Sequence, residues 1–200
     1  MKKISISFFV ILIALFYSFT ITSDDVKERL GVKGPLEFSN TSFNLTWTDK
    51  PRDNYYIQEY LPAGETFESF NQMMTIHLFL TNMSVKEAVD KKITELENRK
   101  RTDILCNSAV SESPDGTEYL VDFILSESKG DEMTIAEFNV YRYKNIDIGN
   151  NEKGIIVYAY TKRSYGENID SFLSKLKDER QDNLNQMVSV DIPSVTIQDK

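Results

Sequence analysis

Two amphipathic helical segments, separated by a long series of extended segments, limit what this chain can fold into. The first covers residues 84–101, where Ser84 and Glu87 form a capping box and apolar residues then recur every three or four positions. The second begins near Asn168 and continues to Met187 with the same period. Each segment has one apolar and one charged side, so each helix is expected to pack against a sheet.

The other apolar segments alternate with polar residues and are bounded by Gly, Pro, Asn and Asp, which is typical of antiparallel strands. Seven such segments cover residues 43–47, 55–61, 73–80, 104–111, 118–126, 133–144 and 155–163. The resulting order of elements is β-β-β-α-β-β-β-β-α. We therefore predict an α+β fold in which an antiparallel sheet of about seven strands packs against the two helices.

The N-terminal 23 residues have the composition of a secretory signal peptide. Met1–Lys3 is cationic, residues 4–21 are apolar apart from Ser and Thr, and a polar stretch with Asp24 and Asp25 follows. No A-x-A cleavage motif precedes Asp24, so an uncleaved N-terminal membrane anchor is the alternative. The pattern predicts an exported protein, periplasmic or secreted, that touches a membrane only through this segment if it is not cleaved.

The rest of the chain is long enough for one domain and short for two. Residues 24–38 contain two Gly and one Pro and are expected to form a flexible lead-in. Residues 39–187 form the predicted single α+β domain, and residues 188–200 form a C-terminal tail that adds an edge strand or stays loose.

The charge and the scarcity of reactive side chains exclude several classes of protein. The chain has 23 Lys+Arg against 31 Asp+Glu, and loss of Lys2 and Lys3 with residues 1–23 leaves 21 against 31, a net charge of −10. Nucleic-acid binding needs the opposite balance. One His and one Cys are too few for a Cys/His zinc site or a disulfide, and no Gly-rich phosphate-binding motif occurs. We expect no cofactor, no metal and no nucleic-acid partner.

Few side chains are candidates for catalysis. His77 and Cys106 each lie within an apolar predicted strand, which favours structural roles over a general base or a reactive thiol. Glu59, Asp122 and Glu137 also lie within predicted strands, where a solvated sheet face explains them better than a catalytic carboxylate pair. We expect no catalytic activity; a small hydrolase or thiol enzyme that uses His77 or Cys106 is the alternative.

One phrase of the sequence resembles a known group of proteins. Residues 60–76 read YLPAGETFESFNQMMTI and, with the preceding Glu59, match a pattern E-Y-x-P-x-G-x-T, an aromatic residue and M-x-T-I of small secreted bacterial proteins of unassigned function. The chain departs from this pattern at Phe70, where a Trp is expected. The element order over residues 39–187 is similar to that of the PsbP-like superfamily, which includes a nuclear import factor that binds the GTPase Ran. The resemblance implies an α/β/α sandwich that binds partners, without an agreed chemistry.

Three tyrosines in one predicted strand, Tyr55, Tyr56 and Tyr60, form a candidate partner surface. Tyrosine is enriched where proteins bind partners. Alternation along the strand places Tyr56 on the face opposite to Tyr55, so at least one of these rings is expected at the surface. The sequence thus predicts an exported, non-catalytic protein that binds a protein or a small ligand. A secreted effector that acts on a host protein is a further alternative.

Overall fold

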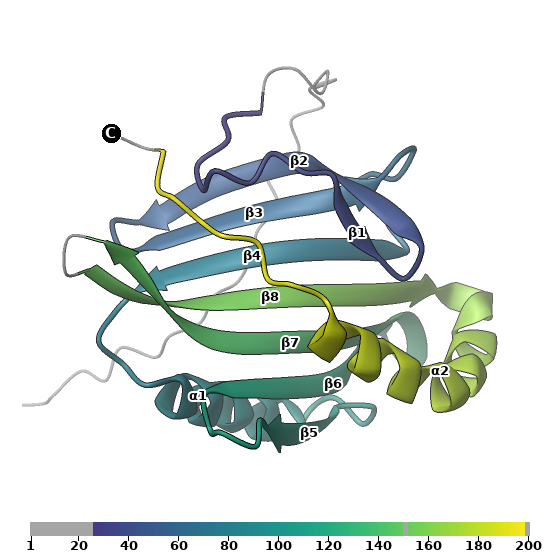
Figure 1. Ribbon diagram of the computed structural model, residues 1–200. Helices are drawn as coiled ribbons and strands as arrows, with labels where there is room; N and C mark the ends of the chain where they lie inside the picture. Colours follow the sequence, from purple (N-terminus) through teal and green to yellow (C-terminus); the bar gives the residue numbers. More distant parts are fainter. Residues whose placement is uncertain (1–25, 150–151, 199–200) are drawn as a thin grey trace, which may run out of the picture.

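Eight strands form one antiparallel sheet that curls into a half-barrel (Figure 1). The structure is a computed structural model that describes residues 26–149 and 152–198, so the expected signal peptide, residues 1–23, lies outside the described residues. The strands are β1 (Leu36–Phe38), β2 (Thr41–Arg52), β3 (Tyr55–Pro62), β4 (Gln72–Leu80), β5 (Asn107–Glu112), β6 (Glu118–Lys129), β7 (Glu132–Gly149) and β8 (Glu152–Tyr165). The helices are α1 (Val85–Arg99) and α2 (Ile169–Ser189), and a 3₁₀ turn, η1 (Gly166–Asn168), precedes α2.

The two halves of the chain form two meanders that meet at the centre of the sheet. The spatial order is β1-β2-β3-β4-β8-β7-β6-β5, so consecutive strands are neighbours within each half. α1 takes the chain from β4, at the centre, to β5, at the far edge. The last strand, β8, then returns to pair with β4, which aligns Ile76 with Tyr158 and Thr75 with Ala159.

The prediction of a seven-stranded PsbP-like sandwich is wrong, because the molecule is mostly one curved sheet of eight strands with two helices. The missed strand, β1, lies within residues 24–38, which were expected to be a flexible lead-in. Its three residues are too few to show alternation, and pairing of Leu36 with Phe43 of β2 defines it instead. β5 begins at Asn107 rather than at residue 104, which leaves Cys106 outside the strand.

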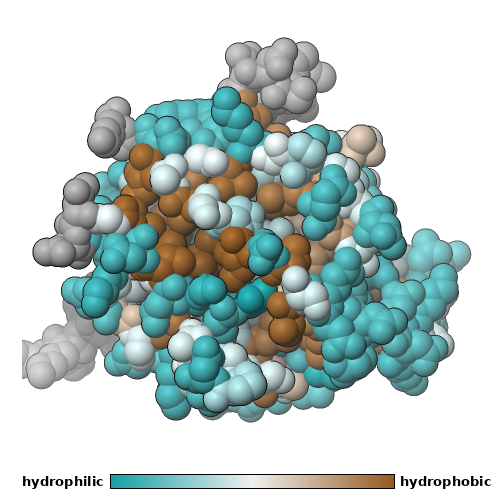
Figure 2. Space-filling model, in the orientation of Figure 1, coloured by the Kyte–Doolittle hydropathy of each residue, from teal (hydrophilic) through white to brown (hydrophobic). Residues whose placement is uncertain are grey.

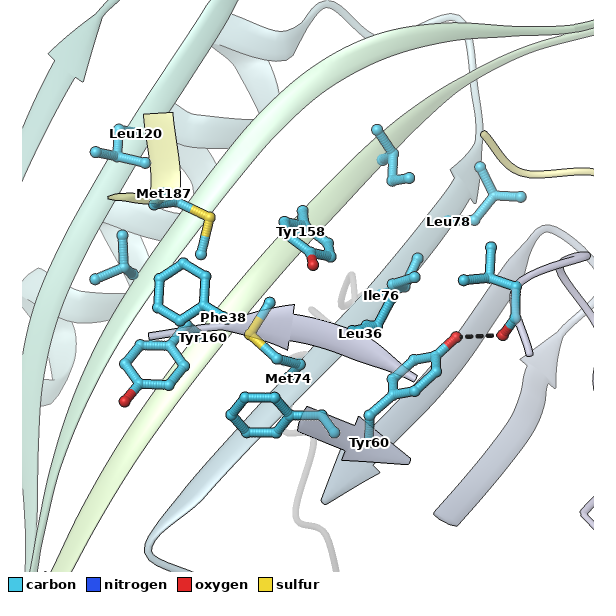
Figure 3. Close-up of a cluster of buried hydrophobic side chains, with 14 of the residues drawn as sticks. Leu36, Phe38, Tyr60, Met74, Ile76, Leu78, Leu120, Tyr158, Tyr160 and Met187 are labelled. Atoms are coloured by element: carbon cyan, nitrogen blue, oxygen red, sulfur yellow. Dashed lines mark hydrogen bonds between the residues drawn. The ribbon is translucent and has the colours of Figure 1, made fainter. Parts of the chain in front are cut away.

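β1, α2 and the stretch that follows α2 cover one face of the sheet. Figure 3 shows Phe38 of β1 and Met187 of α2 beside Met74 and Tyr160 of the central strands, and all four are buried. The chain after α2 adds apolar side chains to this core, at Val190, Ile192, Val195 and Ile197. Figure 2 views this face and shows apolar side chains that reach the surface between polar ones.

α1 covers part of the opposite face, which we call the α1 face. The predicted capping box is present, since the Glu87 N–H donates to Ser84 Oγ at 3.2 Å and the Ser84 N–H donates to the Glu87 carboxylate at 2.8 Å. Val85, Val89 and Leu96 turn the apolar side of the helix towards the sheet. α1 packs mainly on β5, β6 and β7, so the half of this face formed by β2, β3 and β4 extends beyond it.

Gln58 of β3 anchors the segment before β1. Its Oε1 atom accepts the N–H groups of Arg29 at 2.8 Å and Leu30 at 3.1 Å, and its Nε2 atom donates to the Val32 carbonyl at 3.1 Å. The Tyr60 hydroxyl donates to the same carbonyl at 2.7 Å. Gln58, Tyr60 and Leu30 are fully buried. The stretch expected to be flexible is therefore held against the sheet from Arg29 onwards.

Replacement of Gln58 by Leu should lower the free energy of unfolding by about 2–4 kcal/mol, because the Arg29 N–H loses the acceptor that Gln58 provides and the Val32 carbonyl loses a donor. Urea denaturation followed by circular dichroism measures this change. Gln181→Leu, on the exposed side of α2, is the matched control and should change stability by less than about 0.5 kcal/mol. Equal effects of the two substitutions would contradict the anchoring role of Gln58.

Candidate functional site

A row of side chains crosses the α1 face from β2 to β7. Cross-strand pairing aligns Trp47 of β2, Glu59 of β3, Thr75 of β4, Ala159 of β8 and Tyr141 of β7. Directly paired residues point to the same face, so these five side chains form one row, the Glu59 row. Thr75 and Ala159 are small and only 4% and 1% exposed, whereas Trp47, Glu59 and Tyr141 are partly exposed. The row therefore has small, covered side chains in the middle and a partly exposed aromatic ring at each end.

Tyr55, His77 and Phe79 form an aromatic group beside the Glu59 row. The Tyr55 hydroxyl is 2.9 Å from His77 Nδ1, and the Tyr55 ring stacks on Phe79 with 4.5 Å between centroids. Burial, assisted by the Lys92 ammonium, lowers the pKa of His77 to about 4, so its imidazole is neutral near neutral pH. Burial also raises the pKa of Tyr55 to about 12. The three side chains of this group are therefore uncharged near neutral pH, and Tyr55 and His77 are joined by a hydrogen bond.

Glu59 is the unusual member of the row. Burial raises the pKa of its carboxyl to about 7, although the Arg163 guanidinium opposes this shift. Within residues 26–149 and 152–198, the carboxyl has no hydrogen-bond or ion-pair partner. Buried carboxylates are normally paired because removing an uncompensated charge from water is costly. Glu59 therefore offers an acceptor that the rest of the described fold does not use.

The other two acids singled out in predicted strands are compensated. Arg180 of α2 donates to both carboxylate oxygens of Asp122, at 2.7 and 2.8 Å. Arg163 donates through Nε to Glu137 at 2.8 Å, and its guanidinium lies 4.1 Å from the centroid of the Phe70 ring. A solvated sheet face is thus the wrong interpretation for all three acids: two are in ion pairs and Glu59 is partly buried.

The edge of α1 brings a cation close to the far end of the row. Lys92 Nζ lies 4.8 Å from the ring centroid of Phe123 and 5.5 Å from that of Tyr141. The same ammonium donates to Glu95 on the next turn of the helix at 2.9 Å. The Tyr141 ring therefore already accepts a cation on one side.

The candidate partner surface of three tyrosines is divided between the two faces of the sheet. Tyr56 and Tyr60 are 3% and 0% exposed and belong to the core under β1 and α2. Only Tyr55 lies on the α1 face, where it is partly exposed. Alternation separates Tyr55 from Tyr56, as expected, but it does not reveal which of the two faces is filled by other elements.

The two residues of the alternative enzyme hypothesis lie far apart. β8, β7 and β6 separate β4, which carries His77, from β5, so Cys106 just before β5 is about four strand spacings away, roughly 19 Å. The Cys106 thiol contacts the Leu96 carbonyl at 3.5 Å under α1. Burial and the nearby Asp103 carboxylate raise the pKa of this thiol. The structure does not bring His77 and Cys106 together as a base and a nucleophile.

The phrase over residues 60–76 has a local structural role. The Glu65 carboxylate accepts the N–H groups of Asn71 at 2.8 Å and Gln72 at 3.1 Å, which fixes the start of β4. Phe70 is buried beneath Arg163. This loop joins β3 to β4 and so sets the alignment of Glu59 with Thr75 in the row.

Other polar groups on the surface do not form a comparable site. Two open hollows, of about 270 and 450 Å³, lie at the N-terminal ends of α2 and α1. Ser84 and Glu87, which line the larger hollow, already bind each other in the capping box. Among the residues that the structure describes, no group of three His, Cys, Asp or Glu side chains is placed to hold a metal ion.

Comparison with known proteins assigns a family. A protein-family model matches residues 30–192, from the buried segment before β1 to the stretch after α2. The chain belongs to this family. No curated protein and no solved structure matches the chain. The family match includes every residue of the Glu59 row but assigns no activity to it.

Glu59→Gln should stabilise the protein at about pH 8 by about 1–3 kcal/mol and have little effect at about pH 4.5. Folding raises the pKa of Glu59 from its usual value of 4.5 to about 7. Protonated Glu59 therefore favours the folded state, and this contribution to stability is present below about pH 4.5 and is lost as the pH rises through about 7. A neutral amide removes that loss. Urea denaturation at both pH values measures the effect, and Glu37→Gln on the exposed part of β1 is the control. An equal effect of Glu59→Gln at both pH values would contradict the raised pKa.

Cys106 should react with an aromatic disulfide reagent at least about 100-fold more slowly in the folded protein than in urea, because its thiol is buried and its pKa is raised. The absorbance of the released thiol measures both rates. A rate in the folded protein similar to the rate in urea would show that Cys106 is accessible and would support the thiol-enzyme hypothesis.

Proposed function

We propose that this protein is an exported, non-catalytic binding protein that holds a small organic ligand over the Glu59 row. The observation that carries the proposal is the Glu59 carboxyl, which is partly buried, has a raised pKa and has no partner among the described residues. Such a group costs stability, and groups of this kind concentrate at functional sites, where a ligand compensates them. The Trp47 and Tyr55 rings provide apolar contact area beside it.

The chemistry of the site supports binding better than catalysis. His77 is a weak base because its pKa is lowered to about 4, and its Nδ1 atom is engaged by Tyr55. Cys106 is buried between α1 and the sheet, without an imidazole partner in the described part of the chain. The residues on which a hydrolase or a thiol enzyme would depend therefore lack the arrangement that either mechanism needs.

Export is proposed on the N-terminal sequence. A cationic start, an apolar segment and a polar end over residues 1–23 are the support for a periplasmic or secreted location, with an uncleaved anchor as the alternative. No helix in residues 26–149 and 152–198 is long and apolar enough to cross a bilayer.

Trp47 makes the binding proposal directly testable. It is the single tryptophan of the chain and lies directly across from Glu59, so its emission reports on this site alone. The full-length protein should be titrated with benzyl alcohol, benzoate and benzyltrimethylammonium, which differ in charge. As its concentration is raised, at least one of these probes is expected to change the Trp47 emission until the change reaches a plateau.

Two aromatic variants give the matched comparison. Tyr55→Ala removes a ring beside the row and should weaken binding of the saturating probe by about fivefold or more. Phe172→Ala removes a partly buried ring from α2 on the opposite face and should leave binding unchanged. Absence of saturation by all three probes, or equal binding by both variants, would overturn the proposed function.

A further inference from the structure

We infer that the ligand of the Glu59 row is an organic cation that carries an ammonium group, an inference that rests on the function proposed above. Three properties of the α1 face support it: the balance of charges, the Trp47 ring next to Glu59, and the small number of oxygen ligands near it. Each property separates an ammonium ion from another class of ligand.

The ion pairs on the α1 face do not include Glu59. Arg163 is bonded to Glu137, and Lys92 is bonded to Glu95. Glu59 has no such counter-charge among the described residues. A ligand with one positive charge balances this face, whereas an anion is repelled and a neutral ligand leaves the carboxylate unpaired.

One aromatic ring lies next to the carboxylate of Glu59, and a second lies further along the row. Trp47 is aligned directly with Glu59 on the neighbouring strand, whereas Tyr141 is three strands away, at the other end of the row. Ring faces attract cations, most strongly in Trp and Tyr. The position of Lys92 Nζ, 5.5 Å from the Tyr141 centroid, shows that a cation is accepted at one end of this row. A carboxylate beside such rings is a suitable site for an alkylammonium group.

A divalent metal ion fits the row less well than an ammonium ion. Calcium and magnesium bind six or more oxygen ligands, usually from several carboxylates and carbonyls. In the parts of the chain that the structure describes, no three acidic, histidine or cysteine side chains converge on one point. An ammonium group needs only one carboxylate together with aromatic contacts, and the Glu59 row provides both.

Binding of an organic cation should depend on the ionisation of Glu59. The pKa of about 7 implies that its ionised fraction rises from a few per cent at about pH 5.5 to about nine-tenths at about pH 8. His77 and Tyr55, with pKa values of about 4 and about 12, keep one protonation state over this range. The other charged or titratable side chains on this face include Asp49 and Arg52 of β2, Tyr119 of β6, Glu137, Tyr141 and Tyr143 of β7, Arg163 of β8, and Lys92 and Glu95 of α1.

Choline and its uncharged analogue separate charge from shape. In the neutral analogue, a tert-butyl group replaces the trimethylammonium group of choline. The anionic counterpart is tert-butylacetate, the carboxylate ion in which a tert-butyl group is attached to the CH2 of acetate. Titration of the full-length protein at about pH 8, followed by Trp47 emission, should show that choline binds about tenfold or more tightly than the neutral analogue. Tert-butylacetate should not saturate the emission.

Two carboxylate variants test the role of Glu59. Glu59→Gln keeps the shape of the side chain and should lower choline affinity about tenfold or more, whereas Glu37→Gln, at an exposed position of β1, should change it less than about twofold. In the wild type, choline affinity should fall about thirtyfold from about pH 8 to about pH 5.5. Glu59→Gln should abolish that pH dependence, and retention of its near-ultraviolet circular dichroism checks that the variant is folded.

The outcomes distinguish this inference from the proposed function. Saturation by the neutral analogue or by tert-butylacetate at an affinity equal to that of choline supports a binding site but overturns the organic cation as its ligand. Unchanged choline affinity in Glu59→Gln also overturns the inference. Tighter binding of calcium or magnesium than of choline would assign the row to a metal ion instead. Failure of every probe, including the aromatic ones, overturns both the inference and the proposed function.

Discussion

The antiparallel pairing of β4 with β8 is the interaction on which the rest of the structure depends. It joins the two meanders, and it aligns each residue of β4 with a residue of β8, from Gln72 with Lys162 to Leu80 with Gly154. Ile76 and Tyr158 meet in this pairing on the face covered by β1 and α2, while Thr75 and Ala159 meet on the α1 face. Because strand side chains alternate with a period of two, a shift of one residue would exchange the buried core with the α1 face. The core and the Glu59 row are thus fixed by the same pairing.

The position of α1 explains why a polar site lies on only one half of the α1 face. The helix must take the chain from the centre of the sheet to its edge, so it covers the strands on its own side, β5 to β7. Beyond its edge the face carries Glu59, His77 and partly exposed aromatic rings instead of a continuous apolar core. On the opposite face, β1 and the chain after α2 cross the sheet and pack on its apolar core.

Local features of the fold could be predicted from the sequence, and long-range features could not. The capping box at Ser84 and Glu87 and the helical period behind it predicted α1, because both signals lie within a few residues of each other. β1 was missed because three residues carry no period and only pairing with β2 creates the strand. Alternation separated Tyr55 from Tyr56 correctly. It could not tell which of them is buried, since that depends on β1 and α2, which pack on the sheet from distant parts of the chain.

The same limit applies to the candidate site. Glu59, Asp122 and Glu137 are equivalent in sequence, each an acid within an alternating strand, and nothing near them distinguishes one from another. What distinguishes them is a partner supplied from elsewhere: Arg180 reaches Asp122 from α2, and Arg163 reaches Glu137 from the neighbouring strand. Arg163 lies near both acids but is hydrogen-bonded to Glu137, which leaves Glu59 without an ion-pair partner among the described residues. A site of this kind becomes visible only when the ion pairs of the whole sheet are known, because it is defined by a partly buried carboxylate that has no ion-pair partner among the described residues.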